Sequence, residues 1–286
     1  MNKTVAILGP TASGKTALSI KVAKKLDAVV LSLDSLSVYK EIDIISAKPT
    51  IKEREGVVHL GIDEVFLDQE FNAYEFIALY NKAKLMDKNI VIVGGSGFYL
   101  KALIDGLSSN LKIDKINRQK AKNNSQLGYE MILKYDQKYA QKISPRDTYR
   151  IVKWLEIYYQ FGISATEFFK NNPPNSHEDN IELYEIEIKR ETLRSRILKR
   201  TEEMIKNGAI DEVAHLEYKY TRKPKAMNSI GIKEILGYFD GFYDIEKTKE
   251  LISLHTYHLA KRQMTFNATQ FKGVTKIGSD TFDFYI

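Results

Sequence analysis

Cysteine is absent from this chain of 286 residues, which excludes disulfides, thiolate metal sites and a cysteine nucleophile. No apolar run approaches the roughly 20 residues that a membrane-spanning helix needs. A strand pattern begins directly at Lys3, without the features of a signal peptide before it. We therefore expect a cytoplasmic protein with no membrane partner. Separately, we expect a monomer.

Two signatures of nucleotide-binding proteins are also missing. The guanine-recognition pattern Asn-Lys-x-Asp has no match, because "NKAK" at Asn81 lacks the acid. The apolar run "NIVIVGG" ends in glycine, where many ATPases carry a second metal-binding acid. Neither absence excludes a small kinase.

Histidine is scarce, with five in the chain. His255 and His258 lie three positions apart on a predicted helix, but no third ligand accompanies them, which argues against a metal site. His59 could be structural or could lie near a site, and the sequence leaves both open.

The segment "GPTASGKT", Gly9 to Thr16, fits the phosphate-loop pattern G-x-x-x-x-G-K-[ST] at every required position. An apolar run precedes it and a helical pattern follows it. Such a loop attracts anions through its backbone N–H groups and the helix N-terminus. Lys15 is expected to neutralise the terminal phosphate oxygens, and the Thr16 hydroxyl to hold Mg²⁺.

Apolar strands alternate with helices through the first third of the chain. The predicted strands are 4–9, 28–34 and 89–95, and the predicted helices are 15–26, 71–86 and 97–107. A further strand is predicted at 181–188, with long helices after it. Strands that are apolar throughout predict a parallel sheet covered by helices on both faces. The expected fold class is α/β, with a P-loop core formed by residues 1–109 and 176–286.

Residues 110–175 show no strand pattern and predict an inserted helical domain. Its clearest helix lies within 144–162, where Ser144 can cap the start, Pro145 suits the first position and Gly162 can end it.

Two further strand ends should meet the phosphate loop, because ligands in open parallel sheets bind beyond the carboxyl ends of the strands. One end carries Asp34 and Ser35, and the other carries the glycine-rich turn 94–97. Asp34 could be a metal ligand, a general base or only a helix cap. The glycines could merely turn the chain, or could let the backbone approach a ligand closely.

Helical periodicity singles out one arginine. Leu193, Ile197 and Met204 form one helical stripe, and Arg200 falls on it, seven positions after Leu193. An inward-facing arginine needs an anionic partner. That partner is either an internal carboxylate or a bound diphosphate. Arg196 lies at the edge of the stripe.

Several blocks in this order resemble the tRNA dimethylallyltransferase family over nearly the whole chain: "GPTASGKT", "DSLSVYKEIDIISAKP", "GGSGFYLKAL", "RETLRSRILKRTEEMI", "SIGIKE" and "AKRQMTF". Many enzymes share the phosphate loop alone. The second and last blocks are far more specific.

The resemblance implies transfer of a dimethylallyl group from dimethylallyl diphosphate to N6 of adenine 37 in tRNA, beside the anticodon. The loop would then hold a prenyl diphosphate and not ATP. By the same resemblance Asp34 is the general base, while Thr11 and Arg200 join Lys15 and Thr16 at the diphosphate, with Mg²⁺ as cofactor. The diphosphate-binding residues implied are Gly9, Thr11, Ala12, Ser13, Gly14, Lys15 and Thr16.

The resemblance also implies contacts with the anticodon stem-loop, the stem being gripped by the insertion. The residues concerned are Asp34, Ser35, Leu36, Ser37, Ser96, Arg150, Lys153, Gly231, Lys233, Lys261, Arg262 and Gln263. By the resemblance Ser96 is expected near the reacting base, where the family usually has threonine. The family often has glycine where this chain has Ile45, and commonly a Trp-Arg pair where it has Phe266 and Asn267; Ile232 also departs from the usual pattern. These departures leave the diphosphate site intact and leave individual tRNA contacts open.

Three other functions stay open on the residues alone. An enzyme that prenylates free adenine nucleotides would share the loop and Asp34, but needs neither the insertion nor a basic C-terminal helix. A small-molecule kinase would place ATP in the loop. An RNA-binding protein with a degenerate loop is disfavoured by the intact Gly9, Gly14, Lys15, Thr16 and Asp34.

Overall fold

The computed structural model describes residues 2–108, 111–174 and 180–278. The chain divides into two compact units, Met1–Ile104 with Glu178–Ile286, and Asp105–His177. The core and insertion expected from sequence had boundaries at 109/110 and 175/176, which lie outside the described residues.

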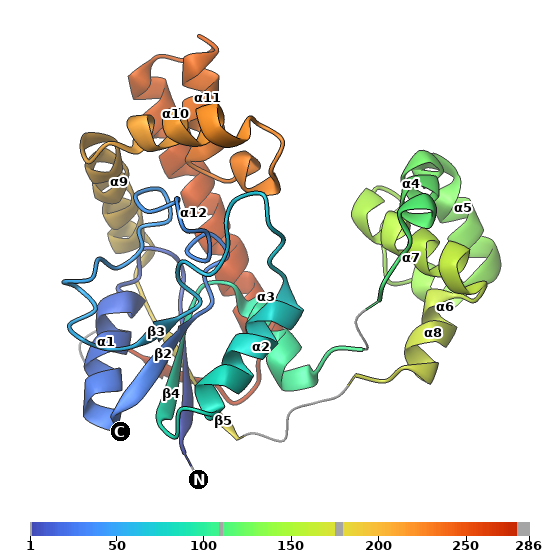
Figure 1. Ribbon diagram of the computed structural model, residues 1–286, viewed down its shortest axis with the longest axis horizontal. Coiled ribbons are helices and arrows are strands. Elements are labelled where there is room, and N and C mark those ends of the chain that lie inside the picture. Colours follow the sequence, from blue (N-terminus) through green and yellow to red (C-terminus); the bar gives the residue numbers. More distant parts are fainter. Residues whose placement is uncertain (1, 109–110, 175–179, 279–286) are drawn as a thin grey trace. The chain divides into compact units, whose positions relative to one another are not determined.

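A parallel sheet forms the centre of the first unit (Figure 1). Its six described strands are β1 (Thr4–Leu8), β2 (Ala28–Ser32), β3 (His59–Leu60), β4 (Asn89–Gly94), β5 (Ile181–Ile186) and β6 (Thr275–Ile277). They follow the order β3-β2-β4-β1-β5-β6, and every neighbouring pair is parallel. The predicted α/β fold with a parallel sheet is therefore confirmed. The short edge strands β3 and β6 were not predicted.

Helices cover both faces of this sheet, which explains why its central strands β1, β2 and β4 are apolar at most positions. On one face, side chains such as Leu31 and Ile92 pack against α2 (Ala73–Lys84) and α3 (Gly97–Asp105). On the other face, Val30 and Val91 pack against α1 (Lys15–Leu26). The whole of β1 is buried.

The C-terminal part of the first unit is helical. It contains α9 (Arg190–Lys206), α10 (Ala209–Tyr220), the 3₁₀ turn η1 (Lys225–Asn228), α11 (Ile232–Phe239) and α12 (Ile245–Gln270). These elements share a core with the loop that follows β2, through Ile42 and Ile45. No described helix combines the length and apolar character that crossing a membrane requires.

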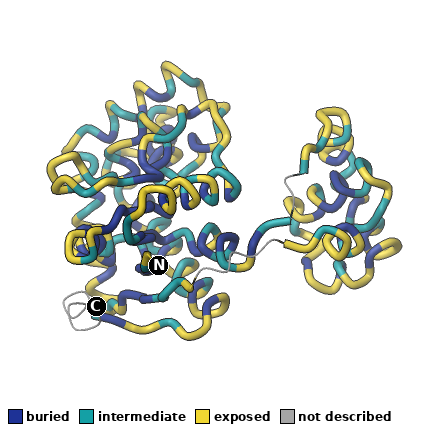
Figure 2. The backbone as a smooth tube through the Cα atoms, turned by 60° about the horizontal axis from the view of Figure 1, so that its bottom comes forward, coloured by how far each residue is buried: buried dark blue, intermediate teal, exposed yellow. Residues whose placement is uncertain are grey.

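The second unit is a small helical domain with its own core (Figure 2). It contains α4 (Lys115–Asn123), α5 (Ser125–Tyr135), α6 (Gln137–Ala140), α7 (Thr148–Phe161) and α8 (Ala165–Asn171). Trp154 of α7 is fully buried at its centre and stacks on Tyr158.

The predicted start of α7 was wrong, whereas its end was correct. Asp147 caps the helix by accepting the Arg150 N–H at 3.1 Å. Ser144 instead stabilises the preceding turn, where its hydroxyl accepts the Arg146 N–H at 3.2 Å and its carbonyl accepts the Asp147 N–H at 2.9 Å. That turn places Pro145 before the helix. Gly162, with φ of 72°, ends it.

A buried carboxylate links the helices of this unit. Asp136 accepts hydrogen bonds from Trp154 Nε1 at 2.9 Å, from the Thr166 N–H at 2.9 Å and from the Thr166 hydroxyl at 2.6 Å. Burial raises the pKa of Asp136, but these bonds and one from the Tyr139 N–H outweigh it, so the pKa is lowered overall.

We expect Asp136→Asn to destabilise the second unit by roughly 1.5–3 kcal/mol, because an NH₂ group would replace an oxygen that faces donors. Since folding lowers the pKa of Asp136, its stabilisation is complete above the unfolded pKa of about 4 and is lost as the pH falls through the folded pKa. Chemical denaturation followed by Trp154 fluorescence would measure this, because the chain has one tryptophan. Asp147→Asn is the matched control. Equal stabilities at pH 7 for Asp136→Asn and the native protein would contradict the prediction.

Candidate functional site

The phosphate loop connects β1 to α1 and has little conformational freedom. Gly14 has φ of 93°, and a side chain on Gly9 would come within 2.9 Å of Ser13 Oγ. The Ser13 N–H closes the loop on the Pro10 carbonyl at 3.2 Å. No side chain caps α1, so its first N–H groups are available to an anion.

Lys15 lies near the end of this loop, and its Nζ donates to the Pro10 carbonyl at 3.0 Å. The pKa of Lys15 is lowered from 10.5 to about 8, chiefly by burial; the charge of Asp34 raises it and that of Arg200 lowers it. The ammonium group is therefore charged in most molecules at pH 7. A bound anion would stabilise that charge.

Asp34 begins the turn that follows β2. Its Oδ1 accepts the N–H groups of Leu36 at 2.8 Å and Ser37 at 3.2 Å. Oδ2 has no hydrogen-bond partner among the described residues. Asp34 thus caps a turn with one oxygen and keeps the other for a ligand, a metal ion or a proton.

Arg200 reaches the same place from α9, on the stripe of Leu193 and Ile197, both of which are buried. Its Nη1 lies 3.5 Å from Thr11 Oγ1, and its Nη2 lies 3.4 Å from the Ser46 carbonyl. Across the described chain no carboxylate lies within 4.0 Å of its guanidinium, so an internal ion pair does not explain it. Burial lowers the pKa of Arg200, and Asp34 raises it.

One cavity collects these groups. It joins the phosphate loop to the turn after β2 and to α9, and the residues on its wall are Thr11, Lys15, Thr16, Ser19, Ser32, Asp34, Ser37, Ser46, Ala47, Pro49, His59, Ile62, Val93, Gly94 and Arg200. Six of them were predicted site residues. Ser46 and Pro49 belong to the "DSLSVYKEIDIISAKP" block, but their pattern alone did not indicate a position on this wall.

His59, which the sequence left undecided, lies on this cavity wall. Its Nδ1 lies 2.8 Å from the Val57 carbonyl and must carry the proton of that bond. Its Nε2 is buried and has no partner in the described part of the chain. Burial lowers the pKa of His59, which favours a neutral ring with a lone pair at Nε2.

Gln263 was predicted to contact tRNA, and it lies against the phosphate loop. Its Oε1 accepts the Thr11 N–H at 2.9 Å. A side chain on Gly95 would meet Gln263 Nε2 at 2.3 Å, so the turn after β4 approaches α12 closely. Ser96, the next residue, is half-buried at the start of α3.

Phe266 and Asn267, which depart from the family pattern, pack next to that turn. A side chain on Gly97 would meet Asn267 Oδ1 at 2.7 Å and Phe266 at 2.8 Å. Asn267 Nδ2 donates to Glu185 Oε1 of β5 at 2.9 Å. Both residues therefore have a packing role where α12 meets the sheet.

Ile45, another departure, packs against Gly231. With φ of 96° at Gly231, a side chain there would lie 2.9 Å from Ile45. The Gly231 N–H donates to Glu234 Oε2 at 2.7 Å, and Oε1 of that carboxylate lies 2.6 Å from His255 Nδ1. His255 is thus paired with Glu234, and no group of three potential metal ligands occurs among the described residues.

The remaining predicted tRNA contacts lie in both units. Lys233 is 3.4 Å from Glu234, whereas Lys261 and Arg262 are exposed on α12 beside a shallow hollow formed with Phe266. In the second unit, Arg150 lies 3.5 Å from Asp147 and Lys153 lies 2.7 Å from Glu156. Their charges are therefore partly compensated within the protein.

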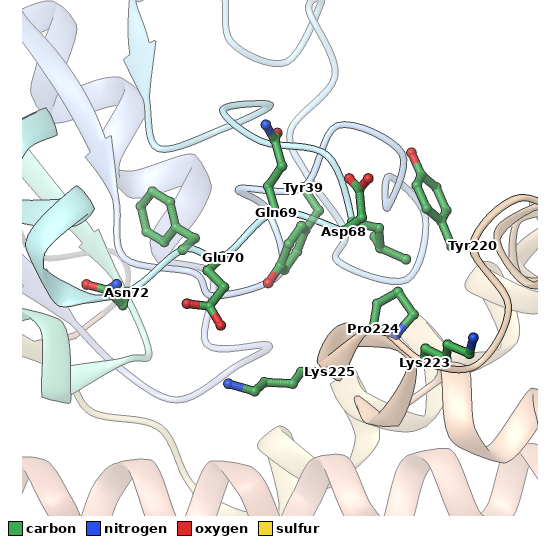
Figure 3. A pocket seen from close by; sticks show the side chains of 11 residues that line it. Tyr39, Asp68, Gln69, Glu70, Asn72, Tyr220, Lys223, Pro224 and Lys225 are labelled. Carbon is green, nitrogen blue, oxygen red and sulfur yellow. The ribbon is translucent and has the colours of Figure 1, made fainter. Parts of the chain in front are cut away.

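A larger hollow on the first unit has a different character (Figure 3). Its wall includes Tyr39, Asp68, Glu70 and Lys225. Burial raises the pKa of Tyr39, and the charge of Glu70 raises it further. The two carboxylates of this hollow are matched by Lys223 and Lys225, and neither the phosphate loop nor a helix N-terminus of the P-loop type lies on its wall, so the cavity of Lys15 is the better candidate for a phosphate.

The fold and this cavity define a P-loop α/β protein that binds a phosphorylated ligand at the carboxyl edge of its sheet. Comparison with known proteins narrows that class. A family model described as IPP transferase matches residues 37–270, and the chain belongs to this family.

Relatives named tRNA dimethylallyltransferase match almost the whole chain. The protein of Sulfurovum sp. is 49% identical over 282 residues, covering 96% of this chain and 94% of its own. That of Sulfurimonas denitrificans is 50% identical over 274 residues, covering 93% and 92%.

Solved structures agree with the sequence comparison. The tRNA isopentenylpyrophosphate transferase of Bacillus halodurans has a TM-score of 0.71 and 29% identity, covering 98% of this chain and 90% of its own. A eukaryotic dimethylallyltransferase described as acting on tRNA has a TM-score of 0.84 and 26% identity, covering 99% and 75%.

We expect Lys15 to make pyrophosphate binding depend on pH. Lys15→Met keeps a similar length without charge and should bind at least about tenfold more weakly at pH 7. Because the pKa of Lys15 is about 8, its charge is full well below that pH and lost above it. The ratio of the two affinities should therefore fall as the pH rises from 7 to 9. Calorimetric titration measures both affinities at each pH. Their ratio removes the effect of protonation of pyrophosphate itself, which is the same for both proteins. A ratio unchanged at pH 9 would show that Lys15 has an ordinary pKa.

Proposed function

We propose that this protein transfers a dimethylallyl group from dimethylallyl diphosphate to N6 of adenine 37 in tRNA, releasing diphosphate, and that it does so in the cytoplasm. The observation that carries the proposal is the single cavity in which Lys15 and Arg200 lie with Asp34. Two cations suit the leaving diphosphate, and a carboxylate suits a proton acceptor. Membership of the IPP transferase family supports this assignment.

The leaving group needs stabilisation because negative charge grows on it as its bond to C1 of the prenyl chain breaks. The loop N–H groups, Lys15 and Arg200 supply that stabilisation from fixed positions. The Thr16 hydroxyl is a hard oxygen ligand of the kind that Mg²⁺ prefers. Thr16 would hold the ion, which when bound would neutralise further charge on the diphosphate.

The acceptor amine is a weak nucleophile and must lose a proton as its bond to C1 forms. Asp34 accepts N–H groups through Oδ1, which leaves Oδ2 to take that proton. The products are then the N6-prenylated adenine, diphosphate and a protonated Asp34.

The apolar part of the cavity wall suits the prenyl chain. Ala47, Pro49, Ile62 and Val93 lie on the same wall as Lys15. A five-carbon donor needs such a surface beside its diphosphate, because burying the chain removes apolar area from water. ATP would present a polar ribose and base instead.

The charge distribution favours RNA as the acceptor. Residues 105–177 contain twelve lysines and arginines against seven acidic residues, so this unit carries most of the net charge of +6. Lys261 and Arg262 add exposed cations on α12. Such groups bind phosphates and position the RNA. The adenine must then leave its stack to reach the cavity, as in other enzymes that modify bases.

The proposal predicts prenylated adenosine when the protein is incubated with unmodified tRNA, dimethylallyl diphosphate and Mg²⁺ without ATP. Nucleoside analysis by mass spectrometry would identify the product, with free AMP as a parallel acceptor. Pyrophosphate should compete with the donor. Prenylated AMP with unreacted tRNA would favour a nucleotide prenyltransferase. Strict dependence on ATP, with ADP released, would indicate a small-molecule kinase instead.

Asp34→Asn should slow the chemical step by roughly 10²-fold or more, because it removes the base. An asparagine carbonyl still accepts the Leu36 and Ser37 N–H groups, so the turn should persist. Single-turnover kinetics would measure the rate, and filter binding should show tRNA affinity within about twofold of the native protein. Near-normal single-turnover chemistry would eliminate Asp34 as the base.

A further inference from the structure

Gln263 connects three elements that the reaction uses. It belongs to α12, its Oε1 accepts the Thr11 N–H of the phosphate loop at 2.9 Å, and its Nε2 fills the space beside Gly95. Gly95 precedes Ser96, and Thr11 lies beside Arg200. One side chain therefore lies between the loop that holds the donor and the turn expected beside the acceptor base.

The phosphate loop is held by helices on both of its sides. Arg196 Nη1 of α9 donates to the Ser13 carbonyl at 2.9 Å, while Gln263 holds the Thr11 N–H. Between them, Ala12 packs against the cluster of Leu193, Ile197 and Ala260, where α9 meets α12. The shape of the loop thus depends on the placement of α12.

Glutamine suits this position for a chemical reason. A neutral carbonyl satisfies the Thr11 N–H without bringing negative charge to an anion site. A carboxylate would repel the diphosphate, and an apolar side chain would leave a half-buried N–H without a partner.

The same turn of α12 presents two cations to solvent. Lys261 and Arg262 directly precede Gln263 and are exposed, and no ion pair involves either in the described part of the chain. Contact of RNA phosphates with these cations would act on the helix turn that holds the loop.

We propose that Gln263 is a positioning residue that fixes the phosphate loop and couples donor binding to RNA binding through α12. The fixing of the loop stands on the geometry alone. The coupling rests on the proposed function, because it requires RNA on α12. Such coupling is reciprocal, so each ligand changes the affinity for the other by the same factor.

The test uses the full chain, with pyrophosphate and an unmodified anticodon stem-loop RNA as probes. Pyrophosphate is titrated calorimetrically with and without saturating RNA, and RNA is titrated by filter binding. The native protein should bind pyrophosphate at least about fivefold more tightly with RNA present. In Gln263→Met, pyrophosphate alone should bind roughly tenfold more weakly. In this variant the ratio of the pyrophosphate affinities with and without RNA, here called the RNA factor, should fall to about one. Its affinity for RNA should change little.

Two variants complete the design. Gln270→Met makes the same replacement at an exposed position of α12 and should behave as the native protein. Gln263→Glu keeps an acceptor for the Thr11 N–H. It can also be used to test the proposal if Gln263→Met fails to fold. The negative charge of Gln263→Glu should weaken pyrophosphate binding, but its RNA factor should stay that of the native protein.

Each contrary outcome has a distinct meaning. Unchanged pyrophosphate affinity in Gln263→Met would overturn the fixing of the loop. The coupling would be overturned if Gln263→Met kept the RNA factor of the native protein. It would also be overturned if Gln263→Glu lost that factor. Loss of RNA affinity alone would make Gln263 an RNA contact. Absence of RNA binding to the native protein would refute the proposed function and the coupling, while the pyrophosphate titration would still decide the fixing of the loop.

Discussion

Two half-buried cations, Lys15 and Arg200, feel the charge of one carboxylate, Asp34, in the cavity at the carboxyl edge of the sheet, and the rest of the site depends on that imbalance. Each of Lys15 and Arg200 has its pKa lowered by burial and raised by Asp34. Holding like charges together without a full set of counter-ions costs free energy, which the surrounding core must offset. In the proposed reaction a diphosphate would supply the missing negative charge. The ligand would then complete an electrostatic arrangement that the fold leaves unbalanced.

That arrangement requires the loop and the arginine to be held by separate elements. The loop follows β1, whereas Arg200 belongs to α9, whose buried residues Leu193 and Ile197 pack against α12. The turn of Asp34 is held by its own carboxylate, and Glu212 of α10 accepts the N–H groups of Asp43, Ile44 and Ile45 at 2.7–3.0 Å farther along the same loop. Site geometry thus arises from contacts between segments far apart in the chain.

The sequence predicted the parts of the site that depend on local patterns. The phosphate loop is a fixed motif, and the inward position of Arg200 followed from helical periodicity. The position of Gln263 against Thr11 could not be predicted, because the two residues are 252 positions apart and no period relates them. His59 was undecided for the same reason. The two-residue strand β3 is too short to show alternation, and Ser144 was misassigned because Asp147 offers an equally good cap closer to the helix.

The position of the helical unit in the chain has a consequence for synthesis on the ribosome. Strand β1 pairs with β4 on one side and with β5 on the other, so Thr4 pairs with both Ile90 and Ile181. All of residues 105–177 must be made before β5 appears. Until then the nascent sheet has an open, apolar edge along β1, of the kind that invites pairing with other chains. Rapid folding of the intervening helices would shorten the span that β5 has to close and so limit the time for which that edge is exposed.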